Sequence, residues 1–241
     1  MTSAEEQQGS WRFRSAQDRK VYLERRAIVR AIISRYFDRK PQNIQYTTNR
    51  FGKPSLIDSP YTFNISKSDG VLVVALSLGC EVGVDTELVR PVKWATDVAL
   101  NFFSLDEQMQ IKSSQDRNLA FLMLWTQHES AIKAFGFGLA SSLGDINVTP
   151  DEIDFPNAEI LANRSEVAVG ITWTHCLFQK QYVTSVASAS EPFSRIRFFS
   201  VGRAFLNSAN SSDIVSLSDF CLFDRTTRFA AWLQEDSNNM I

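Results

Sequence analysis

The sequence is poor in the two residue types that most often build covalent or metal cross-links. Its 241 residues include three cysteines and two histidines. Cys80, Cys176 and Cys221 lie far apart and form no Cys-x-x-Cys pair, so neither a disulfide framework nor a zinc knuckle is indicated. Two histidines leave little for a histidine-rich metal site. We therefore expect a reduced, soluble, cytoplasmic protein.

An excess of charge of one sign is missing as well. Lys and Arg total 25 against 27 Asp and Glu, for a net charge of −2 at pH 7, which argues against nucleic acid or a membrane surface as a partner. No apolar run approaches the roughly 18 residues that a membrane span needs. Residues 1–10 are polar and acidic without the apolar core of a secretory signal, and we expect them to be a disordered lead-in.

Hydrophobic periodicity predicts two long helices. Apolar residues recur at steps of three and four over residues 15–37, with several arginines beside them, and again over residues 118–135. Pro41 ends the first helix. Gly136 and Gly138 end the second.

Strands are predicted after each helix. In the first half they cover residues 43–48, 63–66, 71–78 and 82–85, with a turn at 51–54 and a hairpin at 67–70. In the second half they cover residues 146–148, 167–173, 174–178 and 182–187. A helix followed by strands therefore occurs once in each half. Residues 191–241 hold too many large apolar residues for disorder, and we expect them to pack on the C-terminal half or to dock a partner.

Three acidic residues are candidates for chemistry. Asp85 and Glu87 lie two residues apart at the end of a predicted strand, so both side chains can project to one side of its edge. On the second helix Trp125, Glu129 and Lys133 share a face. Three converging carboxylates would make a hard-oxygen site suited to Mg²⁺, which takes its other ligands from water and substrate phosphates. Taken alone, the Asp-x-Glu pair is more often a solvated turn, and the Glu-to-Lys step of four is most often a surface ion pair.

Five motifs in a fixed order give these residues a context. They are Phe51-Gly52-Lys53-Pro54, Phe63-Asn64-Ile65-Ser66-Lys67-Ser68, Gly83-Val84-Asp85-Thr86-Glu87, Phe102-Phe103-Ser104 with Glu107, and the run from Trp125 to Leu139. From about Arg12 to Ala189 the chain resembles the 4'-phosphopantetheinyl transferases of the surfactin-synthetase (Sfp) type. That family has G-K-P, F-N-x-S-H-S, G-[VI]-D-x-E, F-F…E and W-[ST]-x-K-E-[SA]-x-x-K-x-x-G-x-G-L.

The resemblance implies a fold and a reaction. The fold would be α/β (α+β), with two similar subdomains about a pseudo-twofold axis, each a small sheet packed with a long helix, and the active site between them. Residues 11–100 and 101–190 would be the two subdomains and residues 191–241 a C-terminal extension. The reaction would move the phosphopantetheine arm of coenzyme A to a serine of an apo acyl or peptidyl carrier protein, with Mg²⁺ as cofactor and adenosine 3',5'-bisphosphate as the second product.

The resemblance also implies residue roles. Asp85, Glu87 and Glu129 would hold the Mg²⁺. Glu129 would also activate the carrier serine, directly or through water, and Lys133 would lie against the diphosphate. The coenzyme would be contacted by a further set: Lys53 at the adenosine end with Gly52 and Pro54 shaping its turn, Ser66, Lys67 and Arg26 at the 3'-phosphate, and His128. Arg26 could equally belong to a solvated helix face. An ordinary hairpin residue is the lesser alternative for Ser66.

Two positions depart from the family pattern. Lys67 stands where the family has histidine, and His128 where it has the lysine before the metal-binding glutamate. Lys67 can still bind a phosphate as a permanent point charge. Histidine titrates near neutrality, so we expect activity to rise as the pH falls, unless His128 faces solvent and has no role.

Three functions remain open from the sequence. The first is an active transferase, expected to be a monomer, that serves carrier proteins of fatty acid, polyketide or nonribosomal peptide synthesis. The second is a degenerate relative that binds coenzyme A or a carrier protein without transfer. The third is the same chemistry directed to another acceptor.

Overall fold

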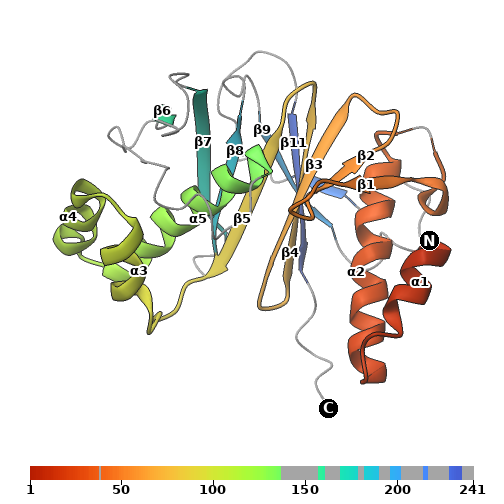
Figure 1. Ribbon diagram of the computed structural model, residues 1–241, viewed down its shortest axis with the longest axis horizontal. Coiled ribbons are helices and arrows are strands. Elements are labelled where there is room, and N and C mark those ends of the chain that lie inside the picture. The colour runs from red at the N-terminus through yellow and green to blue at the C-terminus, as the bar shows by residue number, and fades with distance from the viewer. Residues whose placement is uncertain are drawn as a thin grey trace.

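The structure is a computed structural model, and it describes residues 1–37, 39–136, 157–160, 169–178, 182–189, 196–201, 214–216 and 228–234. The predicted strand at 146–148 and the predicted helix stop at Gly138 lie outside these residues. The described part mixes helices with small, mainly antiparallel sheets (Figure 1), which confirms the α/β (α+β) character of the fold. Among the described helices, none combines the length and hydrophobicity of a membrane span.

The two predicted long helices are present. The helices are α1 (Ala4–Ser10), α2 (Ala16–Ser34), the 3₁₀ turn η1 (Pro41–Asn43), α3 (Ala95–Phe102), α4 (Leu105–Ser113) and α5 (Arg117–Phe135). The ends of α2 and α5 lie within three residues of their predicted ends. α5 stops at Gly136, whose positive φ of 72° closes the last turn, as predicted. α3 and α4 were not predicted.

The strands largely follow the sequence pattern. They are β1 (Tyr46–Thr48), β2 (Pro54–Leu56), β3 (Tyr61–Ser68), β4 (Val71–Leu78), β5 (Val82–Leu88), β6 (Asn157–Ile160), β7 (Val169–Phe178), β8 (Tyr182–Ser188), β9 (Ile196–Val201), β10 (Ile214–Ser216) and β11 (Arg228–Gln234). The predicted strands at 167–173 and 174–178 are one continuous strand, β7. β3 and β5 run to Ser68 and Leu88, beyond their predicted ends.

Three sheets share these strands. β1 pairs with β2, a second sheet has the order β10-β9-β11-β4-β3, and a third has the order β5-β8-β7-β6. β5 precedes residue 100, yet it forms the edge of the sheet that second-half strands complete. β11 pairs with β4, so the C-terminal residues extend the first-half sheet, whereas we had expected them on the C-terminal half or on a partner.

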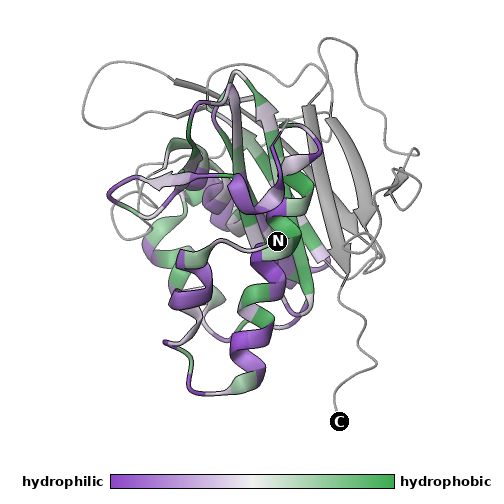
Figure 2. Ribbon diagram, turned by 90° about the vertical axis from the view of Figure 1, so that its right-hand side faces the viewer, coloured by the Kyte–Doolittle hydropathy of each residue, from purple (hydrophilic) through white to green (hydrophobic). Residues whose placement is uncertain are grey.

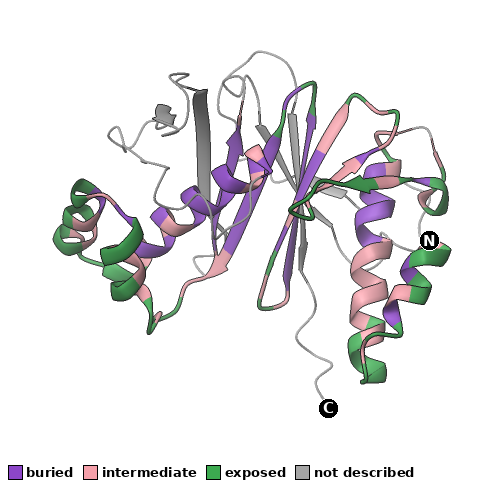
Figure 3. Ribbon diagram, in the orientation of Figure 1, coloured by how far each residue is buried: buried purple, intermediate pink, exposed green. Residues whose placement is uncertain are grey.

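Each long helix covers one sheet with its apolar face. α2 packs Ile28, Ile32 and Ile33 against Phe63, Leu72, Val74 and Leu76 of β3 and β4. α5 packs Phe121, Leu122, Leu124 and Ile132 into a second core with Val183 and Ala187 of β8. Figure 2, which faces the α1–α2 side, shows hydrophobic and hydrophilic residues alternating along the helices. Figure 3 shows the buried residues concentrated on the strands and on α5, while α3 and α4 carry exposed residues.

The first ten residues form an ordered helix, which corrects the expected disordered lead-in. Ser3 and Glu6 cap α1 reciprocally, each side chain bonding the backbone N–H of the other. Glu6 is buried and accepts a hydrogen bond of 2.7 Å from Arg30 Nε. A buried guanidinium needs such a partner, and Glu6 supplies it, so α1 is fixed on α2.

Gly83 allows α5 to lie directly against β5. A Cβ atom at this position would lie 1.9 Å from the Ser130 carbonyl oxygen and 2.3 Å from the Ala134 nitrogen. Both are backbone atoms of α5, so no side-chain rotation could relieve the contact. The glycine therefore sets how closely the helix approaches the strand.

We expect Gly83→Ala to lower the free energy of unfolding by about 3 kcal/mol, the upper end of the usual cost of overpacking, because it forces two backbone segments apart. Urea unfolding measures this. Gly9→Ala is the matched control: it makes the same chemical change inside α1, where the new Cβ would meet only the Tyr22 hydroxyl at 3.5 Å, and should stabilise by up to about 1 kcal/mol. Equal stability of wild type and Gly83→Ala would contradict the close approach.

Candidate active site

One cavity brings together the residues predicted to carry chemistry. It has a volume of about 470 Å³ and is lined by β3, β5 and α5. The lining residues are Ile65, Ser66, Lys67, Asp85, Glu87, Trp125, Glu129 and Lys133. All three predicted metal-binding carboxylates and the predicted diphosphate lysine are among them.

Regular backbone geometry produces this convergence. Asp85 and Glu87 occupy alternate positions of β5 and so face the same side of the strand. Trp125, Glu129 and Lys133 occupy successive turns of α5. Because Gly83 lets α5 lie on β5, the helical face meets the carboxylates of the strand.

An ion pair links the helix to the strand. Lys133 Nζ lies 2.6 Å from Asp85 Oδ1, and the two side chains are 28% and 6% exposed. Burial raises the pKa of Asp85, and Lys133 opposes that effect. Burial and the charge of Asp85 raise the pKa of Glu87. Burial, followed by the charge of Asp85, raises the pKa of Glu129 from 4.5 to about 7. The cavity therefore holds three carboxyl groups, each with a raised pKa, beside the two ammonium groups of Lys67 and Lys133.

The unpaired oxygens of this cavity fit a hard divalent cation. Asp85 Oδ2 and Glu129 Oε1 are buried and have no hydrogen-bond partner, and buried carboxylate oxygens normally have one. In the part of the chain that is described, no three His, Cys, Asp or Glu side chains already form a closed ligand cluster. Mg²⁺ does not require one, since it binds through one or two carboxylates and takes the rest of its shell from water and phosphates. Asp85, Glu87 and Glu129 are the residues that would hold it.

A second cavity, of about 650 Å³, is basic. Arg12, Arg25, Arg26 and Lys67 line it, with Asp18 as the one acidic side chain. Ile65 and Lys67 line both cavities, so the two adjoin at β3. The predicted coenzyme residues Arg26, Gly52, Pro54 and Lys67 all lie here.

Sequence reasoning did not assign Arg12 and Arg25 to this second cavity. The arginine-rich pattern of the first long helix was the available signal for Arg25, but the pattern alone does not tell which arginines face β3. Arg12 precedes that helix, so the pattern gave no signal for it. Tyr22, which lies under the Arg12 and Arg26 guanidinium groups at 5.1 and 5.4 Å, also lines the cavity.

Lys53 is directed elsewhere than predicted. Its Nζ lies 2.5 Å from Glu81 Oε2 and donates to the Ala134 carbonyl oxygen at 2.7 Å. It therefore caps the C-terminal end of α5, where the helix dipole favours a cation. Asn49 supports it by donating to the Gly136 carbonyl oxygen at 2.8 Å.

Ser66 lines the predicted site, but its hydroxyl is engaged within the protein. It accepts from the Thr86 N–H at 3.2 Å and donates to Asp85 Oδ1 at 2.9 Å. Lys133 Nζ lies 3.4 Å away. A hydroxyl has one proton and two lone pairs, so these partners leave it no capacity for the predicted coenzyme phosphate.

The predicted coenzyme contact of His128 is wrong. The residue is fully buried, its Nε2 lies 2.7 Å from Glu107 Oε1, and its ring stacks on Phe103 at 4.8 Å. It lies on the core side of α5, because one residue along a helix turns the side chain by about 100° from Glu129. The alternative that it faces solvent is wrong as well.

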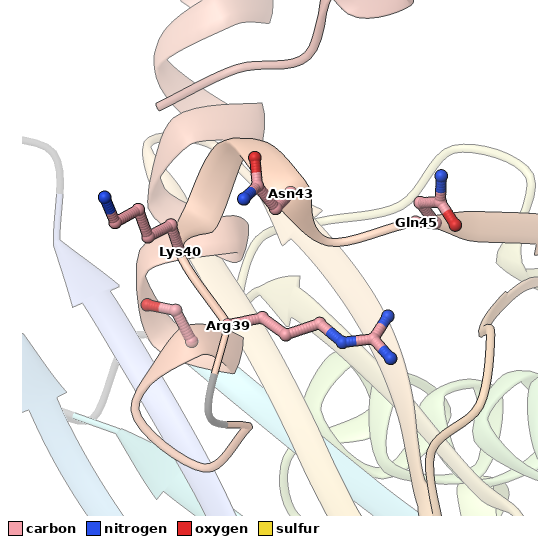
Figure 4. Close-up of a pocket in the computed structure, with 5 residues that line it drawn as sticks. Arg39, Lys40, Asn43 and Gln45 are labelled. Carbon is pink, nitrogen blue, oxygen red and sulfur yellow. The ribbon is translucent and has the colours of Figure 1, made fainter.

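A third cavity holds none of the predicted residues. It has a volume of about 830 Å³ and lies beyond the C-terminal end of α2. Arg39, Lys40, Asn43 and Gln45 line it, and Figure 4 shows their side chains pointing in different directions. They do not converge on a common centre.

Comparisons with known proteins agree with the site. The model of the 4'-phosphopantetheinyl transferase superfamily matches residues 81–187, a range that contains Asp85, Glu87, Glu129 and Lys133. The predicted resemblance is confirmed. The chain is 34% identical over 158 residues to a putative 4'-phosphopantetheinyl transferase of Synechocystis, covering 63% of each protein.

Two further relatives are also named as phosphopantetheinyl transferases. The chain is 31% identical over 149 residues to the 4'-phosphopantetheinyl transferase Sfp of Bacillus subtilis, covering 61% of this chain and 65% of Sfp. It is 26% identical over 195 residues to an L-aminoadipate-semialdehyde dehydrogenase-phosphopantetheinyl transferase of Schizosaccharomyces pombe, covering 71% and 74%. The chain thus spans slightly less than two thirds of the length of the first two relatives.

The raised pKa of Glu129 predicts how stability depends on pH. Between about pH 4.5 and 7 the folded protein holds a proton on Glu129 that the unfolded chain has lost, so the free energy of unfolding falls as the pH rises through this window. Urea unfolding in EDTA at several pH values measures the slope. Glu129→Gln should reduce it, with the remainder left to Asp85 and Glu87. Identical slopes in both proteins would refute the assignment.

The burial of His128 predicts a structural role. His128→Ala leaves the Glu107 carboxylate buried without this partner and should lower the free energy of unfolding by about 3 kcal/mol, while coenzyme A affinity stays within about twofold of wild type. Urea unfolding and calorimetric titration measure the two quantities. Lys67 is exposed and lines both cavities. Lys67→Ala should therefore weaken coenzyme A binding and leave the free energy of unfolding close to that of wild type. Weakened coenzyme binding with normal stability in His128→Ala would restore the coenzyme contact.

Proposed function

We propose that the protein is a Mg²⁺-dependent 4'-phosphopantetheinyl transferase. It would move the phosphopantetheine arm of coenzyme A to a serine of an apo carrier protein and release adenosine 3',5'-bisphosphate. The main support is that Asp85, Glu87, Glu129 and Lys133 line one cavity. When bound, Mg²⁺ would neutralise the diphosphate and stabilise the charge that develops on the leaving phosphate.

Glu129 is the proposed general base. Burial and the charge of Asp85 raise its pKa to about 7 in the cavity without a cation. A bound Mg²⁺ would lower that pKa and leave the carboxylate ionised, ready to accept the proton of a serine directly or through a water molecule. Its unpartnered oxygen, Oε1, is available for that proton. Lys133 would keep its ion pair with Asp85 and present the exposed part of its ammonium group to the diphosphate.

The basic cavity is the proposed site of the nucleotide end of coenzyme A. Its arginines and Lys67 suit the 3'-phosphate, and Gly52 and Pro54 shape the adjoining turn. Lys67 lines both cavities and would therefore lie between the 3'-phosphate and the diphosphate. An acidic cavity beside a basic one suits a ligand that carries a metal-bound diphosphate at one end and a free phosphate at the other.

The proposal includes two similar subdomains about a pseudo-twofold axis. The boundary expected at residue 100 would shift, because β5 pairs with β8 of the second half, and β9, β10 and β11 of the expected extension belong to the sheet of β3 and β4. The protein would act in the cytoplasm as a monomer. Carrier proteins of fatty acid, polyketide or nonribosomal peptide synthesis are the candidate acceptors.

The decisive measurement is the intact mass of an apo carrier protein after incubation with the protein, coenzyme A and Mg²⁺. We expect a gain of one phosphopantetheine arm, absent with EDTA and in Asp85→Ala. Glu129→Gln should keep coenzyme binding but lose about 100-fold or more in transfer rate, since it removes the proton acceptor. Coenzyme binding without transfer to any of several carrier types would instead favour a degenerate binding protein, the second candidate.

A further inference from the structure

β3 and β5 lie side by side without a backbone ladder. Among the described strands, β3 is bonded to β4 and β5 to β8. Side chains of β3 replace the missing ladder: the N–H groups of Val84, Thr86 and Leu88 donate to Asn64 Oδ1, Ser66 Oγ and Ser68 Oγ at 3.1, 3.2 and 3.1 Å. Each bond spans 20 residues, so the two strands run in the same direction.

The two serines also hold the carboxylates of β5. Ser66 donates to Asp85 Oδ1 at 2.9 Å, and Ser68 donates to Glu87 Oε2 at 3.0 Å. Each hydroxyl therefore gives its proton to a carboxylate and accepts the N–H of the next residue along β5. A side chain fixed at both ends in this way has little freedom to rotate.

The orientation of the Glu87 carboxylate depends on Ser68 more than the orientation of the Asp85 carboxylate depends on Ser66. Asp85 is also held by Lys133 at 2.6 Å. Glu87 is only partly buried, and within the described part of the chain Ser68 supplies the one hydrogen bond seen on its carboxylate. Without Ser68, the Glu87 carboxylate would be free to turn away from the cavity into solvent.

We propose that Ser68 is a positioning residue, which directs the Glu87 carboxylate toward the cavity and fixes the end of β5 against β3. Ser68 does not line the cavity and would act through Glu87. The inference rests on the proposed function, in which the Glu87 carboxylate binds Mg²⁺.

The test compares Ser68→Ala with Ser68→Thr, which keeps the hydroxyl. Mn²⁺ affinity in the presence of coenzyme A, measured by calorimetry, should fall about tenfold in Ser68→Ala and stay within about threefold of wild type in Ser68→Thr. Coenzyme affinity without metal should not change in either. Transfer by Ser68→Ala should recover as the Mg²⁺ concentration is raised.

Ser77→Ala is the matched control. It removes a buried serine hydroxyl from the adjacent strand, β4, where the partner is Cys80 Sγ at 2.9 Å. It should bind Mn²⁺ as wild type does, even if it unfolds earlier. If Ser68→Ala fails to fold, Ser68→Cys, which has a weak donor of similar size, takes its place and should also bind Mn²⁺ more weakly.

The outcomes separate the two proposals. Wild-type Mn²⁺ affinity in Ser68→Ala, or equal weakening in Ser68→Ala and Ser68→Thr, would overturn the role of Ser68 and leave the transferase proposal intact. A wild-type protein that binds coenzyme A but no Mn²⁺ would overturn the magnesium part of the proposed function, and the role of Ser68 with it.

Discussion

The close contact between β5 and α5 at Gly83 is the constraint on which the site depends. Because no side chain stands between strand and helix there, Asp85, two residues further along β5, lies within hydrogen-bond distance of Lys133. A larger residue would collide with the backbone of α5 at Ser130 and Ala134. The same backbone contact places Glu129 beside the strand carboxylates, so packing and charge are fixed by one glycine.

That contact produces an electrostatic imbalance. Three carboxylates share a partly buried cavity with the ammonium groups of Lys67 and Lys133. Burial raises the pKa of each carboxylate, and the charge of Asp85 adds to the effect on Glu87 and Glu129. Folding by itself would not favour such a cluster, since uncompensated buried charge opposes it. A cation that arrives with a substrate would relieve the repulsion, so the cluster is understandable as a ligand site and not as a source of stability.

Periodic features of the sequence predicted the parts of the site that follow local geometry. Strand alternation placed Asp85 and Glu87 together, and helical spacing placed Glu129 with Lys133. Long-range contacts were not predictable in this way. His128 occupies the motif position where the family has lysine, but it shares its helical face with Phe121 and Leu124, and this core face determines its contacts. Lys53 and Ser66 are similarly engaged by partners distant in sequence, Ala134 and Asp85.

Contacts at the C-terminal end of α5 link the cavity of Asp85 to the basic cavity. Lys53 and Asn49 bind the carbonyl oxygens of Ala134 and Gly136, and the turn between them carries Gly52 to the basic cavity. The helix that presents Glu129 and Lys133 therefore also fixes the turn at the nucleotide end. A ligand that spans both cavities would meet them at a set separation, and holding reacting groups in a fixed geometry is a large part of what a transferase contributes to rate.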